Sequence, residues 1–312
     1  MIPVRATVPT TAELRTLLAA YRRSTDVDVA ALDAEFGPGD EALLEIVADP
    51  FSSVDDVAER LARAEAHLRE RDDRRSVFLT MYVRMTEAIG EGIEAGAFDD
   101  PEWVASYLVG FAERYRRALV AFERRAFDAV PRAWLLGFAA AVRGEALVAQ
   151  DALTGINAHI NYDLTYTLRD IEIDPDRERK RADHDRINEV LARLVATVQE
   201  TLVEVYDAAG VAGVDALFDP LDDRLALLGL AGSRLFAWRN AVLLADLPAW
   251  LGARYVGWRA RTVSVGAAAL VLAPQIDPGE QETLAAAEAD RRMAVEFGDA
   301  FRRRTGSETI GE

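Results

Sequence analysis

The 312-residue chain contains no cysteine. Disulfides, thiolate metal ligands, iron–sulfur clusters and a cysteine nucleophile are therefore excluded. Histidine and lysine are also scarce: the chain has three histidines, and Lys180 is the only lysine among 36 basic residues. Three histidines are too few for a histidine-rich centre of several zinc ions. One of them, His67, lies in a charged segment, so we expect it to be a solvated surface residue.

Long hydrophobic runs are missing as well. The longest strongly apolar run, residues 263–273, is about half of the ~20 residues that a membrane-spanning helix needs. The N-terminal segment lacks the apolar core of a signal peptide. We therefore expect a soluble, cytoplasmic protein with no membrane insertion.

Basic residues are outnumbered by acidic ones. The chain has 53 Asp and Glu against 36 Lys and Arg, which gives a net charge of −17 and an isoelectric point of about 4.7. Such a surface repels the phosphates of nucleic acids, so nucleic acid is not an expected partner. The acidity also predicts a halophilic protein, because dissolved salt would screen its self-repulsion. Ordinary acidity in a bacterium with a GC-rich genome is the alternative.

The chain also lacks the sustained polar and apolar alternation that strands need. Apolar residues recur instead at helical spacing along nearly the whole sequence. This pattern predicts an all-α protein, a single large irregular helical bundle. The expected helices cover residues 11–23, 40–47, 53–71, 76–95, 101–127, 131–168, 176–208, 222–244 and 280–304. We expect a helical extension over residues 1–49, a core domain over 50–250 and a C-terminal segment over 251–312 that packs on the core.

Polar residues gather near the apolar face of the expected central helix, in the sequence GINAHINYDL. At about 100° per residue, His159, Asp163, Asn157 and Asn161 all border the line of apolar side chains that faces the core. His159 and Asp163 are four residues apart. One can therefore hydrogen-bond the other, or both can ligate one metal ion.

Other polar side chains meet apolar stripes in later helices. In the expected helix 176–208, Asp183 lies in line with the apolar side chains that follow it, and His184 lies at the edge of that apolar face. In the expected helix 222–244, Arg234 lies one turn before Trp238 on the apolar face. A buried carboxylate without a partner costs several kcal/mol or becomes neutral. Asp163 and Asp183 therefore require a cation, hydrogen-bond donors or each other, and Arg234 is a candidate buried cation. A structural network that sets the register of the helices is the alternative to a functional site.

At these residues the chain resembles a family of helical proteins from archaea, bacteria and fungi that is known only as a domain of unknown function. The hallmark of that family is N-A-H-I-N-x-D-L, which stands here as residues 157–164. Further resembling segments are FLTMYVRMT, FDDPEWV, RADHDRIN and SRLFAWRNA, so the resemblance spans residues 54–244. The family pattern has an aromatic residue at His184, so this histidine is not counted among the site residues. The resemblance implies no activity and only groups these residues together.

Several helical chemistries fit poorly. His159, the pair His184-Asp185 and Asp246 follow one another in the order of the metal ligands of metal-dependent phosphohydrolases. In those enzymes the His and Asp of the pair bind the same metals, whereas Asp185 is expected to point away from the apolar face of its helix. The Glu-x-x-His pairs of di-iron sites, the Asp-rich helix of terpene cyclases and the Gly-x-Ser-x-Gly elbow are absent. A Ser-His-Asp triad without that elbow stays open.

The remaining hypothesis is a small-molecule hydrolase with one divalent metal ion as its candidate cofactor. His159 is the candidate general base or metal ligand, and Asp163 orients it or ligates the same ion. Asp183 is the second carboxylate and Arg234 the anion clamp. Substrate contacts are assigned to Asn157, Asn161, Tyr82 and Trp238, with Thr86 as a further hydroxyl. The alternative is a non-catalytic helical binding or scaffold protein whose polar centre is structural.

Overall fold

The computed structural model describes residues 15, 18–21, 29–208, 229–273, 278–289 and 291–307. Within these ranges every regular element is a helix and none is a strand, which confirms the all-α prediction. The predicted helix 11–23 and the first part of the predicted helix 222–244 lie largely outside the described residues. None of the described helices combines the length and apolarity needed to cross a membrane.

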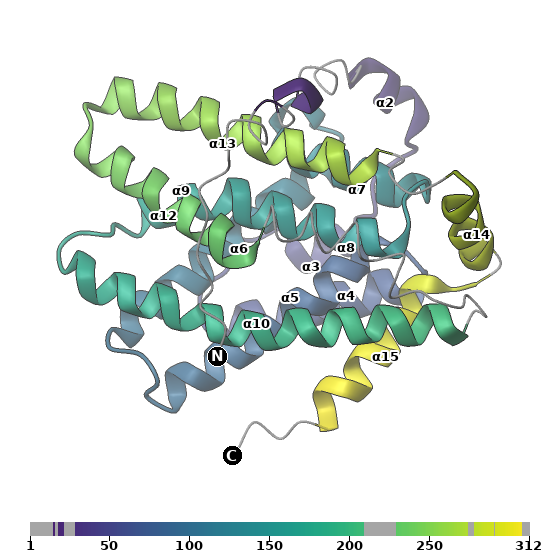
Figure 1. Cartoon of the computed structure of the whole chain (residues 1–312), viewed down its shortest axis with the longest axis horizontal. Helices are drawn as coiled ribbons and strands as arrows, with labels where there is room; N and C mark the ends of the chain where they lie inside the picture. The colour runs from purple at the N-terminus through teal and green to yellow at the C-terminus, as the bar shows by residue number, and fades with distance from the viewer. Residues whose placement is uncertain are drawn as a thin grey trace.

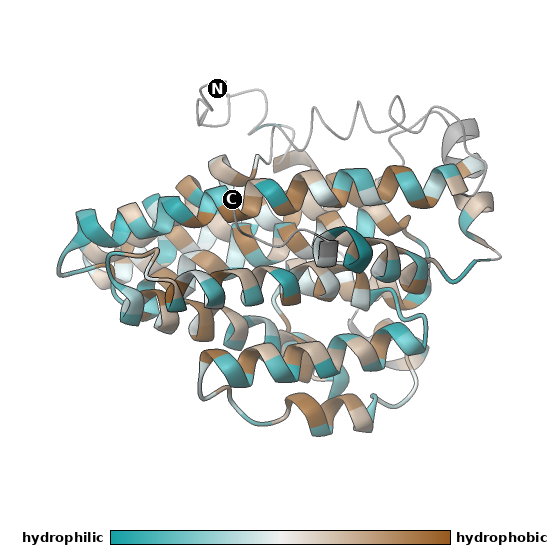
Figure 2. Ribbon diagram, turned by 90° about the horizontal axis from the view of Figure 1, so that it is seen from below, coloured by the Kyte–Doolittle hydropathy of each residue, from teal (hydrophilic) through white to brown (hydrophobic). Residues whose placement is uncertain are grey.

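The helices pack into one irregular bundle, in which α10 runs along one side and α12 and α13 form a hairpin (Figure 1). Hydrophobic and hydrophilic bands alternate along most of them, as expected for amphipathic helices (Figure 2). The helices are α2 (Val29–Glu35), α3 (Glu41–Val47), α4 (Val54–Glu70), α5 (Arg75–Glu94), α6 (Pro101–Glu123), η1 (Phe127–Ala129), α7 (Arg132–Arg143), α8 (Val148–Asn157), η2 (Ala158–Asp163), α9 (Leu164–Asp170), α10 (Arg177–Ala208), α12 (Leu230–Asp246), α13 (Ala249–Leu272), α14 (Pro278–Ala289) and α15 (Met293–Ser307).

Side-chain caps explain where three of these helices begin. The carboxylate of Asp40 accepts a hydrogen bond from the backbone N–H of Leu43, and the hydroxyl of Ser53 accepts one from Asp56. Asp100 caps α6 in the same way, and Pro101 occupies its first turn. Such caps satisfy N–H groups that have no partner within the helix. The three helices therefore begin within one residue of the positions that the sequence predicts.

The region predicted as one helix, residues 131–168, is divided into four elements, so this prediction is wrong. α7 ends at Gly144, whose positive φ of 64° is the left-handed conformation that closes many helices. A new helix, α8, begins at Val148, and η2 and α9 follow it. Hydrophobic periodicity misses the break because both sides keep the helical spacing, although Arg143-Gly144 is a usable stop signal.

Two further differences concern the C-terminal part. α13 was not predicted as a helix, yet it packs against α7, α8, η2 and α12. The predicted helix 280–304 is two helices, α14 and α15. Small residues in α13, such as Gly252 and Ala260, let this helix approach its neighbours closely. Because α13 is apolar around much of its surface, it lacks the clear amphipathic pattern from which a helix is predicted.

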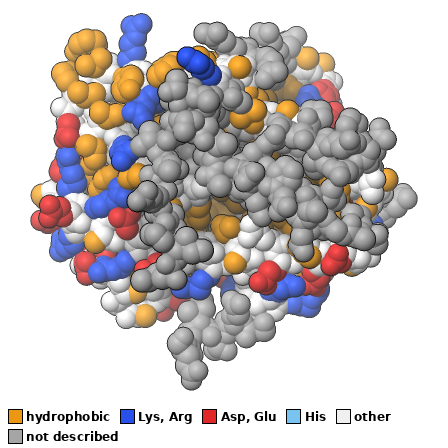
Figure 3. All heavy atoms as spheres, in the orientation of Figure 1, with side chains coloured by type: hydrophobic (Ala, Val, Ile, Leu, Met, Phe, Trp, Pro, Cys, Tyr) orange, Lys and Arg blue, Asp and Glu red, His pale blue; other side chains and the backbone are white. Residues whose placement is uncertain are grey.

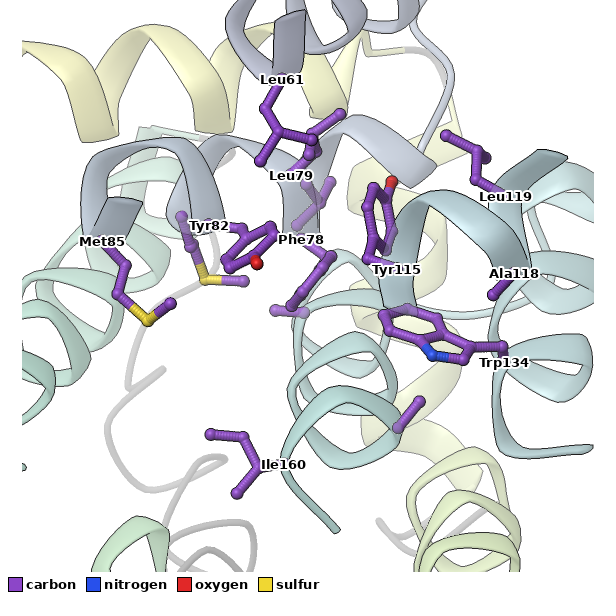
Figure 4. Packing of buried hydrophobic residues seen from close by; sticks show 14 of the residues in the cluster. Leu61, Phe78, Leu79, Tyr82, Met85, Tyr115, Ala118, Leu119, Trp134 and Ile160 are labelled. Carbon is purple, nitrogen blue, oxygen red and sulfur yellow. The ribbon is translucent and has the colours of Figure 1, made fainter. Parts of the chain in front are cut away.

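Aromatic side chains from α5, α6 and α7 form the centre of the hydrophobic core. The ring of Phe78 lies 5.5 Å from that of Tyr115 and 5.3 Å from that of Trp134, measured between centroids. Figure 4 shows these rings together with Tyr82. Edge-to-face and tilted contacts at these distances stabilise a core beyond the area that they bury. The polar residues of η2 are placed against this aromatic layer.

Candidate functional site

The motif predicted to carry the site forms a single π-helical turn, η2, between α8 and α9. A π turn hydrogen-bonds five residues apart and accommodates an extra residue, and such turns are frequent at functional sites. His159, Asn161 and Asp163, which an α-helix would place at the border of the apolar face, are all buried. Asn157, directly before the turn, is buried as well.

His159 and Asp163 form a hydrogen-bonded pair inside this turn. Nδ1 of His159 lies 3.1 Å from Oδ2 of Asp163, and Nε1 of Trp134 donates to the same oxygen at 2.7 Å. Because an ionised carboxylate only accepts hydrogen bonds, we assign the ring proton to Nδ1. Nε2 of His159 is then a bare acceptor, and this buried atom has no hydrogen-bond partner among the described residues.

Aromatic rings enclose His159. Its ring is stacked on Phe111 with centroids 3.5 Å apart and meets the ring of Tyr82 edge-on at 4.5 Å. Burial lowers the pKa of His159 below 6.5 against the opposing effect of Asp163. Burial also raises the pKa of Tyr82, whose hydroxyl lacks a hydrogen-bond partner in the described structure. Both side chains are therefore neutral near pH 7.

Arg234 forms a second polar cluster with residues of α6 and α10. Its Nε donates to Oδ1 of Asn188 at 2.6 Å, and its Nη2 donates to the backbone oxygen of His184 at 2.6 Å. The hydroxyl of Tyr107 lies 3.3 Å from Nη1 of Arg234 and 3.1 Å from Nδ1 of His184. Trp238 packs on the ring of His184 at 5.1 Å. The sequence did not assign His184 to the site, although it contacts two residues that were assigned.

Arg234 has no carboxylate partner among the residues that the structure describes. Its side chain is 2% exposed, and within the described structure all of its hydrogen bonds go to uncharged groups. Other buried arginines differ: Arg75 pairs with Asp73 and Glu123, and Arg116 with Glu113. A buried cation without a counter-ion is costly.

A small cavity lies beside the cluster of Arg234. It has about 20 Å³ of room for the centre of a water molecule, enough for one or two waters or a small polar group. Its walls are largely apolar, with the guanidinium of Arg234 at one side. The lining residues are Tyr82, Met85, Ile89, Val104, Tyr107, Leu108, Phe111, Ile187 and Arg234. Two of these residues, Tyr82 and Phe111, also contact His159, which does not itself line the cavity.

Asp183 lies in neither cluster. Its carboxylate is fully buried and accepts hydrogen bonds from the backbone N–H groups of Asp99, at 2.9 Å, and Asp100, at 2.7 Å. Arg186 adds an ion pair at 2.6 Å. Of the alternatives that the sequence leaves open for Asp163 and Asp183, the structure has separate sets of donors: each carboxylate has its own, and those of Asp183 hold the turn before α6.

The remaining predicted side chains have structural partners. Nδ2 of Asn157 donates to the backbone oxygen of Ser264 in α13 at 2.8 Å, and Asn161 donates to Asn157 at 3.0 Å. The hydroxyl of Thr86 donates to the backbone oxygen of Tyr82, one turn earlier in α5. These bonds tie η2 to α13 and leave neither amide facing the cavity lining.

His67 is not the solvated residue that the sequence predicts. Its Nε2 lies 2.6 Å from Oδ2 of Asp40, and its side chain is largely buried. Asp40 is the cap of α3, which packs against α4, and this contact brings the two residues together. The sequence around His67 is charged and therefore suggested exposure to solvent. Its partner Asp40 lies 27 residues earlier, so a local pattern cannot reveal the contact.

Sequence reasoning missed one buried ionic cluster. Arg74 lies 2.8 Å from a carboxylate oxygen of Glu288 and 3.6 Å from one of Asp151, and Tyr206 hydrogen-bonds Glu288. Burial raises the pKa of Asp151 well above its ordinary value, with Arg74 opposing. The only local signal is Asp151, an acidic residue within the apolar segment VAQDAL. The other members of the cluster come from distant parts of the chain, Glu288 from α14 and Tyr206 from α10.

No three His, Cys, Asp or Glu side chains in the described ranges are grouped so that they could hold a metal ion. Nδ1 of His159 and Oδ2 of Asp163, the predicted metal ligands, face each other at hydrogen-bonding distance instead. The arrangement observed is an oriented imidazole packed behind Tyr82 and Phe111, and a guanidinium at the cavity that these two rings line, without a carboxylate partner in the described ranges. Such a site can bind an anion or remove a proton.

These features define an all-α protein with a buried polar centre in its π-helical turn. Residues 54–274 match the model of a family described as a family of unknown function (DUF5995). The match covers well over half of the chain, so the chain belongs to this family, as the sequence resemblance predicts. No curated protein and no solved structure was found to match it.

Proposed function

We propose that this protein binds a small organic anion in the cavity between α5, α6, α10 and α12, with Arg234 as the charge partner of the ligand. The observation that carries the proposal is the buried Arg234, which has no carboxylate partner in the described ranges and lines a largely apolar cavity. An anionic ligand would supply the missing charge, and a guanidinium is well suited to bind a carboxylate or phosphate.

The cavity restricts the ligand to a compact one, and a ligand larger than one or two waters would enter only if side chains of the lining move aside. Its apolar walls, such as Val104, Leu108 and Ile187, favour a short hydrocarbon part next to the charged group. The hydroxyls of Tyr82 and Tyr107 offer two further polar contacts. We therefore expect a short-chain carboxylate to bind better than an inorganic ion of the same charge or a neutral molecule of the same shape.

The test is thermal unfolding with butyrate, butanamide or chloride at constant ionic strength. At about ten times the dissociation constant, butyrate should raise the melting temperature by about 2–4 °C, whereas butanamide and chloride should not. Constant ionic strength is needed because the chain carries a net charge of −17 and responds to salt in general.

Three variants make this test specific. Arg234→Met should abolish the butyrate shift, and Val104→Ile should reduce it because the added methyl group occupies the cavity while the guanidinium stays. Arg116→Met is the matched control, since it removes a buried arginine that is already paired with Glu113. An equal shift with butanamide, or a butyrate shift that persists in Arg234→Met, would refute the proposal.

The hydrolase hypothesis is the second candidate, and the orientation of His159 favours it. Asp163 holds Nδ1 and leaves Nε2 as a free acceptor, which is the arrangement of a general base. In its single-metal form, the ion would bind at Nε2. The nearest hydroxyl-bearing ring is that of Tyr82, which lines the cavity.

Hydrolysis of p-nitrophenyl butyrate would test this candidate. His159→Phe keeps the ring packing on Phe111 and should lower the rate about 10²–10⁴-fold if His159 is the base. The base must be neutral, and burial lowers its pKa, so the rate should fall with decreasing pH only below pH 6.5. Loss of activity after chelation, restored by a divalent ion, would support the metal form. A rate unchanged by His159→Phe would eliminate the hydrolase role of this residue.

A further inference from the structure

The start of α13 carries a cluster of large exposed side chains. Trp250 is 72% exposed, Trp258 52%, Tyr255 43% and Leu251 38%. Among the described residues, Val142 is the other large hydrophobic side chain with comparable exposure. Figure 3 shows hydrophobic and basic side chains together at the upper left, where α13 begins in Figure 1. Four neighbouring exposed side chains, two of them tryptophans, are unusual on a surface without a partner.

The cluster occupies one face of α13. At 100° per residue, Trp250, Leu251, Tyr255 and Trp258 fall within about 140° of one another around the helix. The opposite face is buried, and a Cβ at Gly252 would lie 3.3 Å from a backbone oxygen of α12. The hairpin partner α12 therefore covers one side of α13 and leaves the aromatic side free.

Arginine is the only charged residue type on this part of the chain. Residues 247–276 contain Arg254, Arg259 and Arg261 and no Asp or Glu, in a protein whose net charge is −17. Arg254 and Arg261 are exposed beside the aromatic face, and the guanidinium of Arg259 lies over the ring of Tyr255 at 5.4 Å. The face is therefore locally positive on an acidic molecule. We call these exposed residues, Trp250, Leu251, Arg254, Tyr255, Trp258 and Arg261, the α13 face.

We propose that the α13 face binds the surface of an anionic lipid bilayer. Trp and Tyr are favoured at the interface between lipid headgroups and hydrocarbon, where their rings are buried and their polar groups stay hydrated. Arginines beside them would contact lipid phosphates. A helix that combines both residue types on one face is typical of peripheral binding parallel to the membrane surface.

The charge of the remaining molecule does not prevent this contact. At 0.15 M salt, charges are screened over about 8 Å, so acidic residues on distant faces interact weakly with the bilayer. The α13 face would touch the headgroups directly. This face fits an anionic bilayer better than a second copy of itself, because a two-fold contact between two α13 faces would bring their arginines together, whereas lipid phosphates would neutralise them.

Flotation with vesicles at 0.15 M salt tests the proposal. The protein should float with vesicles of phosphatidylglycerol and phosphatidylcholine and much less with phosphatidylcholine alone. Arg254→Gln with Arg261→Gln should weaken binding about thirtyfold, at roughly fivefold for each arginine near the surface. Trp250→Ser with Trp258→Ser should weaken it at least about tenfold, because both rings leave the interface. All four side chains are exposed, so the fold should be retained.

Matched controls come from other faces of the molecule. Arg63→Gln removes an arginine whose side chain is 59% exposed, and Val142→Ser removes the exposed hydrophobic residue on α7. Neither should alter vesicle binding. Failure of the wild type to float, or equal flotation of the tryptophan variant, would overturn the proposal. Sedimentation velocity supplies the other outcome: dimers that the tryptophan substitutions dissociate would assign the α13 face to a second copy instead.

Discussion

Replacing His159 by alanine is expected to lower the free energy of unfolding by about 3–5 kcal/mol. The substitution removes a ring that is stacked on Phe111 and packed against Tyr82, and it leaves a cavity in an aromatic core. The substitution also removes one hydrogen-bond donor to the buried carboxylate of Asp163. Of the donors His159 and Trp134, only the N–H of Trp134 would remain. Urea unfolding of both proteins measures the difference.

Two further variants separate the causes of this loss. His159→Phe restores the ring but not the hydrogen bond, so it should recover part of the lost stability. His67→Ala is the matched control, because His67 and its hydrogen-bond partner Asp40 keep 11% and 23% of their side chains exposed, so this contact should contribute about 1 kcal/mol or less. If His159→Ala were as stable as the wild type, the packing of this ring would be dispensable, and its burial would be easier to explain by a role in binding or catalysis.

Gly155→Ala is expected to destabilise the protein by about 1–3 kcal/mol, although alanine is the better helix former. A Cβ at this position would lie 2.5–2.7 Å from three atoms of Phe78. The ring of Phe78 cannot move aside easily, because it is packed against Tyr115 and Trp134. The close approach of α8 to α5 at this point therefore requires glycine.

Gly232→Ala provides the control for this prediction. Gly232 lies in α12, and apart from its own helix no atom of the described residues is within 4 Å of the position that its Cβ would take. Alanine should therefore stabilise this helix by up to about 1 kcal/mol. Thermal or urea unfolding of the two variants should give changes of opposite sign. A stabilising Gly155→Ala would show that Phe78 can be displaced and that the contact between α5 and α8 is looser than the structure indicates.

Helix propensity and periodicity explain how much of the fold could be predicted. The all-α class and the starts of α3, α4 and α6 follow from interactions within a few residues, such as the cap of Asp100 on Trp103. The break at Gly144 and the whole of α13 were missed. At Gly144 the hydrophobic pattern does not change across the boundary, and in α13 it is too uniform to show one apolar face. Tertiary packing therefore decides where these helices lie.

The candidate site divides in the same way. The spacing of His159 and Asp163 predicts contact between them, and the stripe of α12 predicts a buried Arg234, because both depend on one helix only. The partners of Asp183, the neighbours of His184 and the cavity beside Arg234 depend on other helices. No local pattern contains this information.

The sequence by itself therefore determined the helical class, the family and the burial of the polar residues in the central motif and of Asp183 and Arg234. These properties depend on residue types and on spacings of three or four residues, which bring side chains together within a single helix. Only the tertiary structure decided which groups meet. Arg234, for example, donates a hydrogen bond to Tyr107, 127 residues earlier in the chain. Contacts at such separations are set by how whole helices pack, since the shapes of many side chains together select one arrangement.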